Sequence, residues 1–168
     1  MLPLILVLYL SPLSAGHALA AVVFIIASIT DWLDGYLARR LGLTSDFGAF
    51  LDPVADKLLV SGVLLLLVSQ HPGLLVPAVI IILREILVSA LREWMSGKGK
   101  RDSVAVAFSG KLKTTAQMAS MAAMLLVDAE SPDWLYSAGL LGIYVAAALS
   151  LYSGWQYFRG AWSHLTGP

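Results

Sequence analysis

Long apolar runs separated by short polar clusters are the main pattern of the chain. A helix needs roughly 20 largely apolar residues to cross the hydrocarbon core of a bilayer. Gly, Pro and polar residues divide this chain into segments of about that size. Each segment therefore predicts one membrane helix. The predicted helices cover residues 18–39, 49–69, 74–94, 104–127 and 134–157.

The first ten residues, MLPLILVLYL, are equally apolar but too few to span a bilayer alone. They fit the second part of a truncated first helix. A signal peptide that ends at the ALA of residues 18–20 is the alternative, but this segment lacks the basic start typical of signal peptides. We therefore predict an all-α integral membrane protein. It would be a six-helix transmembrane bundle with a partial first helix (1–10), and residues 1–168 would form one domain.

The composition agrees with a membrane protein. Of the 168 residues, 58% are hydrophobic and only 13% are charged, and the mean hydropathy is +0.79, which is too apolar for a solvated surface. The absence of cysteine excludes disulfides and thiolate metal sites. A net charge of zero gives no reason to expect a nucleic-acid partner.

Lysine and arginine are concentrated in every second connection between the predicted helices. This predicts an orientation, because cytoplasmic loops are enriched in both residues. The connections at residues 11–17, 69–73 and 128–133 contain neither. The other connections and the C-terminal segment therefore face the cytoplasm, and six spans place both termini there. Anionic lipid headgroups are the expected partners of the basic loop at 98–101. The basic residues concerned are Arg39, Arg40, Arg92, Lys98, Lys100, Arg101, Lys111, Lys113 and Arg159.

Four aspartates stand at the cytoplasmic ends of two successive predicted helices. Asp31 and Asp34 share one helical face because they are three residues apart, and Asp52 and Asp56, four apart, share another. The short connection RLGLTSDFG makes the two helices antiparallel neighbours, so the carboxylates converge. Ionised aspartates cost roughly 2.5–3.5 kcal/mol each near a bilayer core. A divalent cation such as Mg²⁺ offsets that cost with carboxylate and phosphate oxygens as ligands.

Single aspartates at helix ends are more often caps, and Pro53 after Asp52 suits a helix start. The arrangement of four, with Gly35 and Gly48 giving room for a close approach, favours a binding site. The residues between 31 and 56 also match a long spaced pattern, DxxDGxxARx8GxxxDxxxD. The matching residues are Asp31, Asp34, Gly35, Ala38, Arg39, Gly48, Asp52 and Asp56.

That pattern resembles the signature of the CDP-alcohol phosphotransferases. The resemblance implies transfer of a phosphatidyl group from CDP-diacylglycerol to an alcohol, with release of CMP. It implies Mg²⁺ as cofactor, with Mn²⁺ as an alternative and two ions bound. Asp31, Asp34 and Asp52 would bind metal at the pyrophosphate, and Asp56 would be the general base and touch the second ion. The donor would be bound by Gly35, Ala38, Arg39, Ser45 and Gly48.

Two further segments, at 84–95 and 110–118, resemble the bacterial phosphatidylglycerophosphate synthases of this family. They imply glycerol 3-phosphate as acceptor, a bacterial inner-membrane location and a homodimer. The acceptor phosphate would be bound by Arg84, Arg92, Lys111 and Lys113. Another acceptor, as in cardiolipin or phosphatidylinositol-phosphate synthesis, is the alternative within the family. A cation transporter is the alternative outside it, although its carboxylates would be expected near the membrane midplane.

The basic residues also have structural explanations. Arg84 lies within an apolar run, so it should face a polar cavity or pair with Glu85 or an aspartate. Arg92 is near the interface and could snorkel instead. Because Lys111 and Lys113 are about 200° apart on a helix, only one of them is expected to reach a small ligand.

Overall fold

The computed structural model describes residues 1–41, 46–97 and 108–165. Within these ranges it describes all side chains except those of residues 32, 35–36, 38–39, 41, 46–53, 108–112 and 163–165. The described chain is all-helical, as predicted. Its elements are α1 (Leu2–Leu10), α2 (Gly16–Leu41), α3 (Asp46–Gln70), the 3-10 helix η1 (Pro72–Leu74), α4 (Leu75–Gly97), α5 (Phe108–Leu125) and α6 (Asp133–Leu165).

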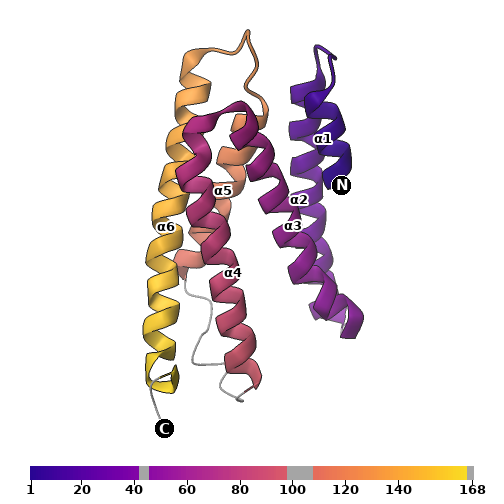
Figure 1. Cartoon of the computed structure of the whole chain (residues 1–168). Helices are drawn as coiled ribbons and strands as arrows, with labels where there is room; N and C mark the ends of the chain where they lie inside the picture. Colours follow the sequence, from indigo (N-terminus) through magenta and orange to yellow (C-terminus); the bar gives the residue numbers. More distant parts are fainter. Residues whose placement is uncertain (42–45, 98–107, 166–168) are drawn as a thin grey trace.

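The helices run up and down in two neighbouring groups (Figure 1). One group contains α1, α2 and α3, and the other contains α4, α5 and α6, with α6 packed along both α4 and α5. Contacts of α2 with α5 and of α3 with α4 join the two groups. Four helices, α3 to α6, can therefore contribute side chains to one space inside the bundle.

The uneven distribution of basic residues along the chain becomes a difference between the two ends of the bundle. The α1–α2, α3–α4 and α5–α6 connections lie at one end in Figure 1, and α2, α4 and α6 finish at the other. Arg40, Arg92 and Arg159 belong to the last turns or last third of α2, α4 and α6. The connections without Lys or Arg thus share one end of the molecule, as the sequence predicts.

Two stretches are long and apolar enough to cross a membrane, Pro72–Gly97 and Asp133–Trp162. Only 33% and 28% of their most apolar windows are buried inside the bundle, so most of this apolar surface faces outward. Outward-facing leucine and isoleucine on this scale are unfavourable in water. Gly16–Asp31 is apolar but shorter. The prediction of six α-helices is confirmed for the described residues, and two of these helices, α4 and α6, are long and apolar enough to be candidate membrane spans.

Residues 1–10 form a helix that packs within the bundle. The side chains of Ile5 and Tyr9 are buried, and Leu2 lies against Gly62 of α3 so closely that a Cβ at Gly62 would overlap it. Ser11 ends the helix, since its hydroxyl donates to the Leu8 carbonyl at 2.7 Å. These contacts make α1 a packed helix of the bundle.

Several predicted helix boundaries were wrong because polar residues were taken as ends. The last helix continues through Leu165 rather than ending at residue 157. The helix predicted from residue 49 begins at Asp46. Gln, Arg and His have adequate helix propensity, so a polar residue alone does not stop a helix.

Small residues bring α5 and α6 close together. A Cβ added at Gly142 would lie 3.0 Å from the Ser120 Cβ, and one at Gly139 would lie 2.7 Å from the Met124 Sδ. The sequence GLLG at 139–142 therefore serves helix packing within the chain. Ser120 cannot move far, because its hydroxyl donates to the Ala116 carbonyl at 2.7 Å.

We predict that Gly142→Ala lowers the stability of the bundle by about 1–3 kcal/mol, the usual cost of overpacking. The added methyl group would force α5 and α6 apart. Gly97→Ala is the control, since nothing lies within 4 Å of its added Cβ. Thermal unfolding in detergent would compare the two variants, and equal melting temperatures would contradict the close packing of α5 on α6.

Candidate active site

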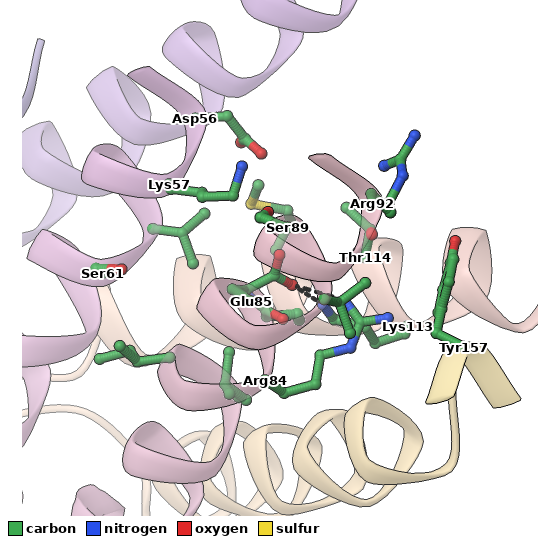
Figure 2. A pocket seen from close by; sticks show the side chains of 16 residues that line it. Asp56, Lys57, Ser61, Arg84, Glu85, Ser89, Arg92, Lys113, Thr114 and Tyr157 are labelled. Carbon is green, nitrogen blue, oxygen red and sulfur yellow. Dashed lines mark hydrogen bonds and ion pairs between the residues drawn. The ribbon is translucent and has the colours of Figure 1, made fainter. Parts of the chain in front are cut away.

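A polar cavity of about 260 Å³ lies between α3, α4, α5 and α6 (Figure 2). Most of the ionisable residues around it come from α3 and α4, and Tyr157 contributes a ring from α6. The cavity is therefore far more charged than the rest of the interior. Its charged side chains are Asp56, Lys57, Arg84, Glu85, Arg92 and Lys113.

Helical spacing brings these residues to one side of each helix. Glu85, Ser89 and Arg92 follow one another at four and three residues along α4, so they form one stripe. On α5, Lys113 and Gln117 are four residues apart and line the same space. The register of α4 against α5 then decides which side chains meet across the cavity.

Glu85 joins the two most enclosed cations. Its carboxylate forms an ion pair with Lys113, whose side chain is only 4% exposed. Arg84, 12% exposed, donates from Nη1 to the same carboxylate oxygen at 3.3 Å. One carboxylate thus partly neutralises two buried cations. Counted over the whole cavity, four positive and two negative side chains leave a formal charge of +2. We call this space the cationic cavity.

A second cavity, of about 550 Å³, lies between α2, α3 and α5. Most of its lining is apolar, with Phe24, Ile25 and Ile29 from α2. Two carboxylates, Asp31 and Asp56, stand on its wall. Asp56 therefore borders both the apolar cavity and the cationic cavity. A molecule with an apolar part and a polar part could reach Asp56 from one side while a small anion approached from the other.

The structure brings two of the four predicted metal ligands together. Asp31 of α2 and Asp56 of α3 line the same cavity, as the antiparallel arrangement of their helices predicts. Asp34 is exposed and lines neither cavity. The side chain of Asp52 lies outside the described residues. Among the side chains that are described, no group of three or more His, Cys, Asp or Glu forms a metal site.

The predicted donor-binding residues lie next to these aspartates along the chain. Gly35, Ala38 and Arg39 belong to α2, and Gly48 belongs to α3. Their side-chain positions lie outside the description, as does Ser45 altogether. Their assignment to the donor stays a prediction.

Three of the four predicted acceptor residues gather in the cationic cavity. Arg84, Arg92 and Lys113 all line it, although they come from two helices. Arg84 also forms the ion pair with Glu85 that the sequence offered as an alternative, and its binding of the acceptor stays a prediction. Of the pair Lys111 and Lys113, the side chain of Lys113 is described and lines the cavity. The side chain of Lys111 lies outside the described residues, as does the loop with Lys98, Lys100 and Arg101.

Sequence reasoning missed several residues of the cavity. Glu85 was considered only as a partner of Arg84, yet it also pairs with Lys113 across the gap between α4 and α5. Ser61 and Gln117 were not considered at all. A signal existed, because Ser61 lies four residues after Lys57 and Gln117 four after Lys113, on the same helical faces.

A model of the CDP-alcohol phosphatidyltransferases matches residues 1–152 of the chain. The match contains both aspartate pairs and all four predicted acceptor cations. The chain belongs to the CDP-alcohol phosphatidyltransferase family. Family membership favours an enzyme over the cation transporter considered from the sequence.

Curated relatives of the family resemble the chain over nearly its whole length. A protein of Salmonella choleraesuis is 46% identical over 165 residues, which is 96% of this chain and 88% of the relative. One of Yersinia enterocolitica is 43% identical over 172 residues, covering 100% of this chain and 92% of the relative. Both are named CDP-diacylglycerol–glycerol-3-phosphate 3-phosphatidyltransferase. The resemblance to the CDP-alcohol phosphotransferases found in the sequence is thus confirmed.

The charge of Glu85 should be needed to keep two cations in the cavity. We predict that Glu85→Gln, which keeps the shape but removes the charge, destabilises the protein by about 2 kcal/mol. This is less than the roughly 3–5 kcal/mol for a fully buried pair, because Glu85 remains 25% exposed. Glu93→Gln is the matched control on the same helix, since Glu93 is exposed and should cost under about 0.5 kcal/mol.

Denaturant or thermal unfolding of both variants in detergent would measure the difference. Equal losses for Glu85→Gln and Glu93→Gln would mean that the ion pair with Lys113 contributes no stability.

Proposed function

We propose that the chain transfers a phosphatidyl group from CDP-diacylglycerol to glycerol 3-phosphate, giving phosphatidylglycerophosphate and CMP. The observation that carries the proposal is the position of Asp56 between an apolar cavity and a cationic one. The donor has a lipid part and an anionic part, and the acceptor is a small phosphate ester. The names of the relatives point to the same pair of substrates.

Asp56 is the proton acceptor in this proposal. A hydroxyl of glycerol 3-phosphate attacks the phosphorus that carries the diacylglycerol, a new P–O bond forms, and the bond from that phosphorus to the CMP oxygen breaks. The hydroxyl proton passes to the Asp56 carboxylate as the attack proceeds. Asp56 lines both cavities, which supports this role, because an acceptor in the cationic cavity would meet there a donor held near Asp31.

The cationic cavity suits a phosphomonoester. At neutral pH such a group carries nearly two negative charges, and the lining carries a formal charge of +2. Arg84 can offer paired N–H donors to phosphate oxygens, while Lys113 acts as a compact charge. Uncharged alcohols would leave these cations without a ligand, which disfavours them as acceptors.

Asp31, Asp34, Asp52 and Asp56 are proposed to hold Mg²⁺, or Mn²⁺ in its place, as two ions. The carboxylates of Asp31 and Asp56 on one cavity wall fit such a site, because hard divalent cations prefer oxygen ligands. When bound, the ions would neutralise charge on the pyrophosphate and stabilise the departing CMP. Gly35, Ala38, Arg39, Ser45 and Gly48 would contact the nucleotide part of the donor.

The protein is proposed to be a multi-pass protein of the bacterial inner membrane, with its active site facing the cytoplasm. The end of the bundle that carries Arg40 and Arg159 would face the cytoplasm. Arg92 lies close to the end of α4 on that side and lines the cationic cavity, which supports access of soluble glycerol 3-phosphate from the cytoplasm. A homodimer is also proposed.

An assay of CMP release in detergent micelles tests the reaction, with CDP-diacylglycerol, Mg²⁺ and a panel of alcohols. We predict turnover with glycerol 3-phosphate, no turnover with glycerol, and loss of turnover when EDTA removes the metal. Preference for inositol phosphate or phosphatidylglycerol would reassign the acceptor within the family. CMP release that is unaffected by every acceptor would contradict the transfer reaction.

Asp56→Asn keeps the size of the side chain but removes its ability to take a proton. We expect turnover to fall by about 10²–10⁴-fold, the usual contribution of a general base, while Mg²⁺-dependent donor binding is largely kept by the three other aspartates. Single-turnover CMP release and binding of labelled CDP-diacylglycerol would be measured on the same sample. Turnover near the starting rate would remove Asp56 from the role of base.

A further inference from the structure

Arg84 approaches the cavity from α4, but its side chain is held by α6. We infer that Ser153, Gly154 and Tyr157 are positioning residues that aim the Arg84 guanidinium at the acceptor phosphate. All three lie on one face of α6 and beyond residue 152, where the family match ends. The inference rests on the proposed function, because it takes Arg84 as a ligand of the acceptor.

The hydroxyl oxygen of Ser153 is positioned to accept a hydrogen bond from Arg84. Its side chain is buried, with 1% exposed, and its hydroxyl donates to the Ser150 carbonyl of the preceding turn at 3.2 Å. A serine hydroxyl has only one proton, so its lone pairs are left to face Arg84. Arg84 Nη2 donates to this oxygen at 2.8 Å. The bond fixes one edge of the guanidinium without using a carboxylate.

Gly154 makes room for the aliphatic part of the same side chain. A Cβ at this position would lie 3.2 Å from the Arg84 Cγ and 3.8 Å from its Nε. The first distance is tighter than ordinary van der Waals contact, so any larger residue would push the arginine stem away from α6. The absence of a side chain at 154 thus lets the aliphatic part of Arg84 lie against α6.

Tyr157 supports the guanidinium one turn further along α6. The Arg84 Cζ lies 5.7 Å from the centre of the Tyr157 ring, within the range of a cation–π interaction. Tyr157 is largely buried and also lines the cavity. Its ring therefore supports the charge of Arg84 in a region with little water.

Together with Glu85, these contacts hold Arg84 on several sides. Arginine has three carbons between its backbone and its guanidinium, and ordering them on ligand binding would cost conformational entropy. Contacts that order the side chain in advance reduce that cost. Loss of Ser153 should therefore weaken acceptor binding while leaving proton removal at Asp56 and donor binding intact.

The test compares wild type, Ser153→Ala, Arg84→Ala, the double variant and Ser150→Ala in the CMP-release assay. Ser150 is a matched control, because it is fully buried on the same face of α6 and its hydroxyl has no partner among the described residues. Initial rates are measured against both glycerol 3-phosphate and CDP-diacylglycerol, so that KM and kcat separate for each substrate.

We expect Ser153→Ala to raise the KM for glycerol 3-phosphate about tenfold, as for loss of a hydrogen bond to a charged group. The kcat and the KM for CDP-diacylglycerol should stay within about twofold, and an unchanged donor KM also reports an intact fold. Arg84→Ala should raise the acceptor KM further, and adding Ser153→Ala to it should change nothing more. Ser150→Ala should behave as wild type.

Other outcomes would overturn the inference in distinguishable ways. An acceptor KM unchanged in Ser153→Ala but raised in Arg84→Ala would refute positioning by α6 and leave the acceptor site standing. Additive effects in the double variant would mean that Ser153 acts independently of Arg84. No CMP release by the wild type would refute the proposed function itself. If Ser153→Ala does not yield folded protein, Gly154→Ala gives the same test, because its methyl group displaces the Arg84 stem.

Discussion

The need to pair buried charge is the constraint on which the rest of this structure depends. Lys113 is almost fully enclosed, and an unpaired ammonium in such a place would cost several kcal/mol. Glu85 removes most of that cost, but only if α4 and α5 keep the register that places the two side chains together. Both helices pack along α6, and the ion pair links α4 directly to α5. Glu85 and Lys113 both line the cavity, so the link between the two helices forms part of its wall.

Asp56 joins the two halves of the proposed chemistry. Its position on α3 borders the apolar space beside α2 and the cationic space beside α4. A transfer between a lipid-linked donor and a water-soluble acceptor needs such a meeting point, since acyl chains are poorly solvated in water and a charged phosphate is poorly solvated in an apolar space. The two-group arrangement of the helices in Figure 1 provides it, with α3 lying between α2 and α4.

The sequence predicted those features that depend on one helix or on two joined by a short connection. The convergence of Asp31 with Asp56 follows from spacing and from antiparallel neighbours, and the structure bears it out for this pair. The partnership of Glu85 with Lys113 could not be predicted, because it depends on the register of α4 against α5. The length of α6 was missed since polar residues near its end still allow a helix. Asp52 lies outside the described side chains, so the four-carboxylate site stays a prediction.

Ser153 illustrates why binding and stability are hard to separate in an apolar protein. A guanidinium in water finds partners at no cost, but in this bundle each N–H of Arg84 needs an acceptor from the protein or a ligand. The hydrogen bonds that offset the cost of burying the Arg84 guanidinium also determine the orientation of that group. Gly154 has no side chain and contributes only close packing, yet by this argument it influences the affinity for a ligand that it does not touch. Kinetic separation of the acceptor KM from the donor KM distinguishes the two effects where a melting temperature cannot.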